Sequence, residues 1–184
     1  MTGSDDRARA EFERLFRETR EDLLAYALRR SPTPEDAADV VAETYLIAWR
    51  RLERVPGGDR ARLWLFGVAR NVLRKGRARR HGRDRLVERL ARELRASGLG
   101  VPSAADERVA AVRKALDRLP SRDREVLTLS AWEGLTPQEI AAVTGMSANV
   151  VRVRLHRARN RLKKQLDPPR AAVARTDAVA LERD

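Results

Sequence analysis

Arginine is the side chain whose number and spacing in this sequence could do chemistry, and that chemistry is the binding of anions. A segment without any acid carries six cationic side chains, which are Arg70, Arg74, Lys75, Arg77, Arg79 and Arg80. Like charges three and four positions apart on a helix repel one another, and a polyanion relieves that repulsion. A solvated basic helix face is the alternative interpretation, and we favour contact with nucleic acid.

A second basic segment, within residues 135–164, follows a short apolar helix and a glycine. Thr136, Pro137 and Glu139 have the spacing of a capping box, and Gly145 can adopt the left-handed conformation that ends a helix. Ser147 is predicted to cap the next helix, whose apolar stripe is Val151, Leu155, Ala158 and Leu162. Another face of that helix carries Asn149, Arg152, Val153, His156 and Arg157. This pattern predicts a helix-turn-helix whose second helix enters the DNA major groove, with an ordinary helical hairpin as the alternative.

Composition narrows the classes of protein that the chain can belong to. A net charge of +12 in 184 residues indicates a polyanionic partner, with nucleic acid ahead of an anionic membrane. Aromatic residues make up only 4% of the chain, which suits two small helical units better than one large core. There is no apolar run long enough for a membrane span and no apolar signal core, so we expect the chain to act in the cytoplasm.

The sequence contains no residue pattern that indicates catalysis or metal binding. The chain has no cysteine, and its two histidines, His81 and His156, lie far apart in arginine-rich contexts. There are no paired carboxylates, no serine–histidine–aspartate set and no glycine-rich phosphate loop. We therefore expect neither an enzyme nor a bound cofactor or metal.

Helical periodicity runs through most of the chain, and no strand pattern of useful length occurs. Helices are expected over residues 5–30, 33 or 34 to 54, 60–80, 106–119 and 121–134, besides the helix-turn-helix. The apolar stripe of the first helix is predicted to comprise Phe12, Leu15, Phe16, Leu23, Leu24, Ala27 and Leu28. Ser121 is predicted to cap the helix that it begins, and Trp132 to pack that helix. In the helix before it, Val109, Val112, Leu116 and Leu119 are the predicted apolar face.

Three segments, in this order and spacing, resemble the sigma-70 family of RNA polymerase sigma factors, in its extracytoplasmic-function (ECF) group. They are PEDAADVVAETYLIAWRRLE at 34–53, RLWLFGVARNVLRKGRARR at 62–80, and the stretch from ALDRLPSRDREVL to RARNRLKK at 115–164. The resemblance implies an all-α fold of two small helical domains joined by a flexible linker. Residues 1–83 would form region 2, 84–104 the linker, 105–166 the helix-turn-helix of region 4, and 167–184 a tail.

The resemblance also implies a function and a set of partners. Such proteins bind the RNA polymerase core through its β′ clamp and β subunits, direct it to promoters with minus-ten and minus-thirty-five elements, and catalyse nothing themselves. The partners implied are thus the polymerase core and promoter DNA. Many relatives are also held inactive by an anti-sigma protein.

Matching the family's motifs to this chain assigns roles to individual residues. The residues implied to bind core polymerase are Asp39, Val40, Val41 and Glu43. Trp64 and Asn71 match positions near the minus-ten strand, and Asn71 would read a base drawn from the stack. The charge pattern predicts phosphate contacts beside them from Arg70, Arg74, Lys75 and Arg77. At the minus-thirty-five element the match covers Arg152, Val153, His156 and Arg157, and the helix-turn-helix pattern adds Ser147 and Asn149 as DNA-binding residues.

A stand-alone DNA-binding regulator is the competing hypothesis. A repressor is more often a dimer with one DNA-binding unit, whereas this chain has two basic regions in tandem and no ligand or receiver domain.

Overall fold

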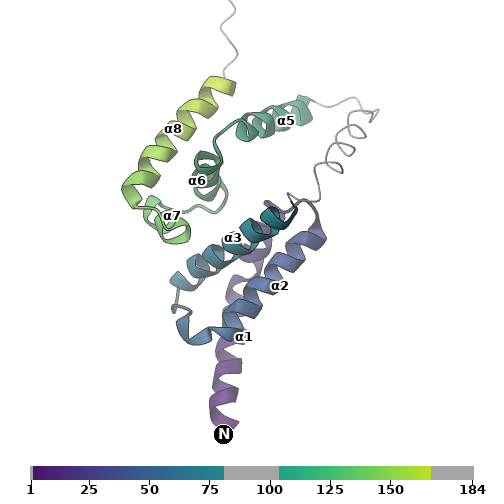
Figure 1. The fold of residues 1–184 in the computed structure, drawn as a ribbon, viewed down its shortest axis with the longest axis vertical. Coiled ribbons are helices and arrows are strands. Elements are labelled where there is room, and N and C mark those ends of the chain that lie inside the picture. The colour runs from purple at the N-terminus through teal and green to yellow at the C-terminus, as the bar shows by residue number, and fades with distance from the viewer. Residues whose placement is uncertain (1, 81–103, 167–184) are drawn as a thin grey trace, which may run out of the picture.

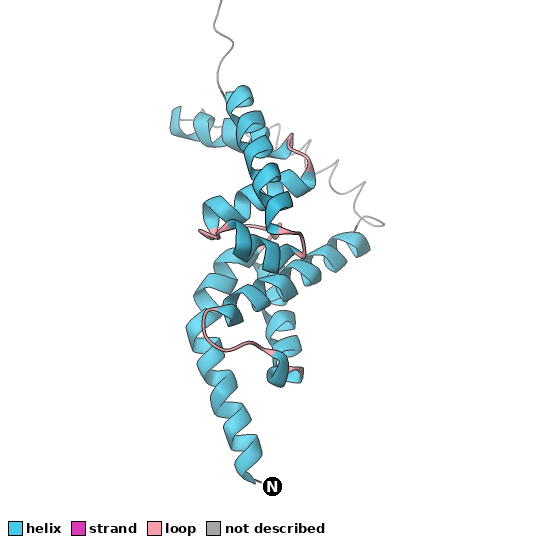
Figure 2. Ribbon diagram, turned by 90° about the vertical axis from the view of Figure 1, so that its left-hand side faces the viewer, coloured by secondary structure: helices cyan, strands magenta, loops and turns pink. Residues whose placement is uncertain are grey.

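The computed structural model describes residues 2–80 and 104–166, in which all regular structure is helical (Figure 1; Figure 2). The N-terminal unit comprises α1 (Thr2–Leu28), α2 (Pro34–Arg50), the 3₁₀ turn η1 (Leu52–Arg54) and α3 (Arg60–Arg80). The C-terminal unit comprises α5 (Ala104–Asp117), α6 (Ser121–Trp132), α7 (Pro137–Thr144) and α8 (Ala148–Leu166). The all-α fold class is confirmed. The predicted tail, and the predicted linker except for Ala104, lie outside the described residues.

Local chemistry explains where α2 begins and ends. The Thr33 hydroxyl accepts a hydrogen bond from the backbone N–H of Asp36 at 3.1 Å, and Pro34 occupies the first helical position. The prediction that the helix continues to Arg54 was wrong, because the chain tightens into η1 after Arg50. Pro56 follows closely and disfavours a helical conformation at the residue before it.

The start of α6 also differs from the prediction. Ser121 is the first helical residue and not the cap, and Pro120 holds the cap position without a side-chain hydrogen bond. The carbonyl oxygen of Pro120 instead accepts the backbone N–H groups of Asp123 and Arg124, both at 2.9 Å.

The core of the N-terminal unit lies where α1, α2 and α3 meet, and it uses a narrower stripe of α1 than predicted. The buried residues of α1 are Leu15, Thr19, Leu23, Tyr26 and Ala27. Phe16, Leu24 and Leu28 were predicted to pack, but each is more than 40% exposed. The hydroxyl groups of Thr19 and Tyr45 lie 3.0 Å apart, which satisfies both polar groups inside the core. Burial raises the pKa of Tyr45 above 10.0.

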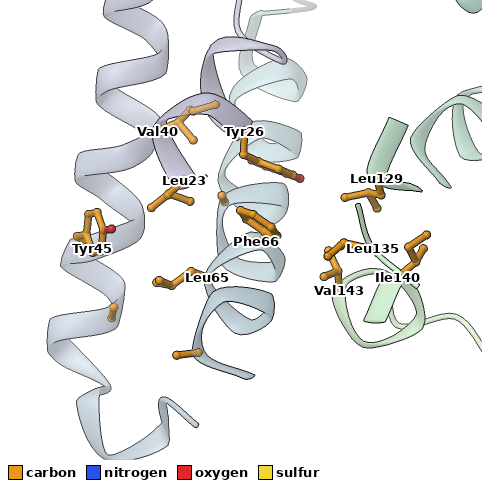
Figure 3. Packing of buried hydrophobic residues seen from close by; sticks show 14 of the residues in the cluster. Leu23, Tyr26, Val40, Tyr45, Leu65, Phe66, Leu129, Leu135, Ile140 and Val143 are labelled. Atoms are coloured by element: carbon orange, nitrogen blue, oxygen red, sulfur yellow. The ribbon is translucent and has the colours of Figure 1, made fainter. Parts of the chain in front are cut away.

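The main hydrophobic cluster continues from the N-terminal unit into the C-terminal unit. Helix α3 packs against α7, and the cluster that contains Leu65 and Phe66 also contains Leu135, Ile140 and Val143. Figure 3 shows the two groups, with Phe66 and Val143 on the sides that face each other. The two helical units therefore share a buried hydrophobic cluster where α3 meets α7.

A smaller hydrophobic cluster holds α5, α6 and α8 together. It contains Leu119, Leu127 and Ala158, with Leu116 and Leu162 packed against it. Three residues predicted to pack there are instead exposed, namely Val109, Val112 and Trp132.

A buried carboxylate joins α6 to α8. The side chain of Asp123 is 4% exposed, and its two oxygens accept hydrogen bonds from Arg154 at 2.8 Å and Arg161 at 2.6 Å. A buried charge is stable only when it is paired, so this clamp fixes how α8 lies on α6.

The turn between α7 and α8 is built by its caps. Glu139 accepts the backbone N–H of Thr136 at 2.7 Å, and the Thr136 hydroxyl accepts the backbone N–H of Glu139 at 3.3 Å. Gly145 has a φ of 73° and donates its N–H to Ala141 at 2.9 Å. The Ser147 hydroxyl accepts the backbone N–H of Val150 at 3.3 Å. The predicted capping box, the left-handed glycine and the Ser147 cap are confirmed.

We expect Asp123→Asn to lower the free energy of unfolding by about 3 kcal/mol, because it leaves two arginines facing a neutral amide in a partly buried site. Urea unfolding of the full chain measures this change. Asp117→Asn is the matched control, because Asp117 pairs with Arg124 at 2.6 Å on the surface and its loss should cost less than about 1 kcal/mol. Equal effects of the two substitutions would contradict a structural role for Asp123.

The capping box gives the fold a defined dependence on pH. The hydrogen bond from the Thr136 backbone lowers the pKa of Glu139 below its ordinary value of 4.5. A carboxylate with a lowered pKa in the folded state adds stability above pH 4.5, and that stability is lost as the pH falls through the folded value. The difference in free energy of unfolding between the native chain and Glu139→Gln should therefore shift in this acidic range. A difference that stays flat across this range would contradict the prediction.

Candidate nucleic-acid interface

The exposed face of α8 gathers every residue that the sequence predicts for the minus-thirty-five element, except the capping Ser147. Val151, Leu155 and Ala158 are buried and seat the helix on the rest of the unit. The opposite side is exposed and consists of Asn149, Arg152, Val153, His156 and Arg157. Arg152 donates to Asn149 at 3.5 Å, and His156 and Asn160 lie within hydrogen-bond distance at 3.0 Å. These contacts run along the surface of one helix, so the face is open to a large partner.

Not every arginine of α8 is available to a partner. Arg154 and Arg161 are bound to Asp123, so the basic sequence of this helix overstates its free charge. The cationic residues of α8 that are exposed are Arg152, Arg157, Arg159, Arg161, Lys163 and Lys164, and only Arg161 of these pairs with Asp123. This remaining face is cationic and contains no acid, which suits a polyanion.

The residues predicted on α3 differ in their exposure and in their contacts. Asn71, Arg74 and Lys75 are exposed, and Trp64 is half-buried. Arg70 is different, because its guanidinium forms two hydrogen bonds with Glu125 of α6, at 2.6 and 3.0 Å. The hydrogen bond with Glu125 raises the pKa of Arg70 above its ordinary value, so this side chain stays charged. The side chain of Arg77 lies outside the described residues.

The residues predicted to bind core polymerase lie on α2 with different accessibilities. Asp39 and Glu43 are exposed and lie one turn apart, which places them on the same face. Val41 is half-buried, whereas Val40 belongs to the core and supports the helix from beneath. Leu46, which the sequence reasoning missed, is 42% exposed and continues the same face at a spacing of three from Glu43. Leu46 lies seven residues after Asp39, which is two helical turns, and this spacing was the sequence signal that could have placed it on the same face.

Glu125 and Glu133 are the other side chains that sequence reasoning missed. Glu133 pairs with Arg30 at 2.7 Å and also with Arg29, although about a hundred residues separate these partners. No local pattern marks such a contact, since both glutamates lie in or directly after α6 and their partners are far away in the sequence.

The described ranges contain no cluster of three or more histidine, cysteine, aspartate or glutamate side chains placed to hold a metal ion. Within the same residues, no helix is both long and apolar enough to cross a bilayer.

Comparison with known proteins assigns both units. Residues 15–84 match Sigma-70 region 2, and residues 110–162 match Sigma-70 region 4. The RNA polymerase sigma factor CnrH of Cupriavidus metallidurans is 34% identical over 154 residues, covering 78% of this chain and 81% of that protein. The ECF RNA polymerase sigma factor SigL of Mycobacterium tuberculosis is 36% identical over 150 residues, covering 78% and 82%.

The solved structures agree with this assignment. The structure of CnrH in complex with the cytosolic domain of CnrY matches with a TM-score of 0.57 at 30% identity, covering 85% of this chain and 87% of that one. Both predicted regions are thus present in the predicted order, in a chain that spans most of its relatives' length. The protein therefore belongs to the ECF group of the sigma-70 family, the factors that direct RNA polymerase to specific promoters.

Proposed function

We propose that this sigma factor reads the minus-thirty-five element with the exposed face of α8 and the minus-ten strand with α3, while α2 binds the polymerase clamp. The observation that carries the proposal is the acid-free face of α8, which the α7 turn and the Asp123 clamp hold rigidly. Residues 1–83 would act as region 2, 105–166 as region 4, and 84–104 as the link between them.

Recognition at minus thirty-five requires donors and apolar groups at the floor of the major groove. Arg152 and Arg157 are exposed and have the fork geometry that pairs with guanine. Val153 lies between them in sequence, and its exposed methyl groups suit contact with a thymine methyl. The lysines at the end of α8 would meet phosphates, which adds affinity without sequence preference.

Recognition at minus ten requires a base that has left the duplex. The exposed amide of Asn71 can bond the edge of such a base, and Trp64 lies two helical turns away on the same side of α3. Arg74 and Lys75 supply phosphate contacts beside them. Opening a base step costs a few kcal/mol, and single-strand contacts of this kind offset the cost without ATP.

Binding to the polymerase core would use the outer face of α2. Asp39 and Glu43 present two carboxylates to solvent one turn apart, and Val41 and Leu46 add apolar surface. Linking two weakly binding DNA modules through one large partner raises their combined affinity, because the second contact becomes intramolecular.

The protein would act as a binding factor and not as an enzyme, in the cytoplasm where the polymerase works. CnrH is known in complex with the cytosolic domain of CnrY, which supports a protein regulator of the anti-sigma kind for this chain as well.

Replacing Arg152 by alanine should cost about 1–3 kcal/mol of binding at one minus-thirty-five position and relax the base preference there. Binding of the holoenzyme to a set of promoters with single changes in that element measures this effect. Lys164→Ala is the matched control and should weaken binding to all the sequences about equally, as expected for a phosphate contact. A uniform loss for Arg152→Ala as well would mean that Arg152 contacts only phosphate.

Gel filtration with core polymerase tests the proposed role of α2. The native chain should co-elute with the core and start transcripts at defined sites. Asp39→Asn with Glu43→Gln should raise the dissociation constant for core polymerase about tenfold or more, because two charged contacts are lost. Less of this variant should therefore co-elute with the core. Glu21→Gln with Asp117→Asn removes the same charge elsewhere and should change nothing. If the native chain fails to co-elute but binds DNA tightly alone, the stand-alone regulator becomes the better hypothesis.

A further inference from the structure

Two valines lie next to each other on the outer face of α8, where most of the other side chains are polar or cationic. Val150 is 43% exposed and Val153 is 49% exposed. They lie in the first two turns of the helix and three positions apart, so they are neighbours on its surface. Single exposed apolar side chains are common on proteins, and the informative feature is that these two are adjacent. We call Val150 and Val153 the valine pair.

The packing of the chain does not account for the valine pair. Neither valine belongs to the hydrophobic clusters of the described residues, to which α8 contributes Val151, Leu155, Ala158 and Leu162. Helix propensity does not account for the pair either, because a side chain branched at Cβ favours a helix less than alanine or arginine does. The apolar surface of the pair is therefore free to contact another molecule.

The charge around the valine pair indicates what kind of molecule can cover it. Helix α8 contains no acidic residue, and Arg152 and Arg157 are exposed on either side of the pair. A neutral apolar partner would leave these cations unpaired, whereas DNA supplies phosphates for them. The apolar group that the edge of a base presents in the major groove is the C5 methyl of thymine. The same methyl is present in 5-methylcytosine. DNA that carries a C5 methyl therefore matches both the charge of this face and its apolar pair.

Arg157 lies on the same stripe of α8 as the valine pair. It follows Val153 by four positions and Val150 by seven, which places all three side chains on one side of the helix. Neighbours at this spacing have Cβ atoms about 5–6 Å apart, and successive bases rise by about 3.4 Å. A methyl group that touches Val153 would therefore lie within about two base pairs of a guanine bonded by Arg157.

We propose that Val150 and Val153 together read the C5 methyl group of a pyrimidine in the minus-thirty-five element, beside the guanine bonded by Arg157. The methyl is the group recognised, so the pair accepts thymine and 5-methylcytosine alike and disfavours unmethylated cytosine. Valine has one strongly preferred rotamer in a helix, so little side-chain freedom is lost when the methyl docks. This inference rests on the proposed role of α8 at minus thirty-five and adds Val150 to it.

This form of recognition makes promoter choice sensitive to a chemical mark on DNA. Removing one methyl group from water on an apolar surface changes an affinity by about fourfold. Methylation of a cytosine at the position read by the valine pair would therefore strengthen a promoter by about that factor.

Selection of promoter duplexes with a randomised minus-thirty-five element, bound by the holoenzyme, locates the position that is read. The native chain should enrich a thymine, on either strand, within about two base pairs of an enriched guanine. Val150→Ala with Val153→Ala should enrich the guanine without the thymine. Leu166→Ala is the matched control, because Leu166 is 39% exposed near the end of the same helix, and it should enrich the native sites. No enriched thymine with the native chain would overturn the proposal.

Replacement of the enriched thymine by 2′-deoxyuridine then removes the methyl and leaves the hydrogen-bonding groups of the base unchanged. Holoenzyme with the native chain should bind the deoxyuridine duplex about fourfold more weakly than the thymine duplex. Holoenzyme with both valines replaced should bind the two duplexes equally, and Leu166→Ala should keep the native ratio. The same ratio in the native chain and in the valine variant would overturn the proposal.

The same position is next occupied by cytosine or by 5-methylcytosine, each paired with guanine. The native chain should bind the methylated duplex about fourfold more tightly, and the valine variant should bind both equally. A preference for thymine without a preference for 5-methylcytosine would mean that another group of thymine is read, and it would overturn the proposal.

These outcomes stay distinct from those of the proposed function. If Arg152→Ala relaxes a base preference but the native chain ignores the methyl, α8 reads the element and this inference alone fails. If the holoenzyme shows no base preference anywhere in the element, the proposed role of α8 fails and this inference fails with it. Circular dichroism of the valine variant should match that of the native chain, because alanine favours a helix at exposed positions.

Discussion

The carboxylates of Asp123 and Glu133 are almost entirely removed from water, and each is met by two arginines. A carboxylate at such a site is tolerated only with its partners in place, so these two groups dictate which helices must lie together. Asp123 sets α8 on α6 within the C-terminal unit, and Glu133 sets that unit on α1. The orientation of α8 follows from the first, and the relation of the two units from the second.

This requirement also divides the arginines into two functional groups. Arg30, Arg70, Arg154 and Arg161 neutralise acids of the protein itself, whereas Arg152 and Arg157 face solvent. A net charge of +12 is therefore a poor measure of the charge offered to DNA. What matters is where the unpaired cations lie, and among the described side chains of α8 they lie on one face.

Sequence patterns predicted the parts of the molecule that depend on neighbours within a few residues. The capping box at Thr136, the left-handed Gly145 and the buried stripe of α8 were predicted and confirmed, because caps and helical spacing act over one or two turns. The bounds of α3 were also predicted, whereas α2 ended earlier than predicted and the start of α6 was missed by one residue. The roles of the proposed site residues came from the family resemblance and from the charge pattern. The residues predicted on the outer face of α8 are exposed, as their helical spacing indicates.

Contacts between distant segments could not be predicted in this way. Glu133 and Arg29 are 104 residues apart, and Arg70 and Glu125 are 55 apart, so no periodicity connects them. The same limit applies to α1, where periodicity admitted Phe16 and Leu24 to the core but only the position of α2 and α3 could decide which side was covered. Tyr26 was missed because its use as the platform for Arg30 depends on Phe66 from another helix.

Gly67 has no side chain, and it lies beside the backbone of α7. An alanine there would make an ordinary contact with Val143 and would favour the helix by roughly 0.5–1 kcal/mol. Any longer side chain would have to displace α7 or turn aside. A side chain larger than alanine at this one position would therefore alter how closely α3 and α7 pack, although glycine itself carries no functional group.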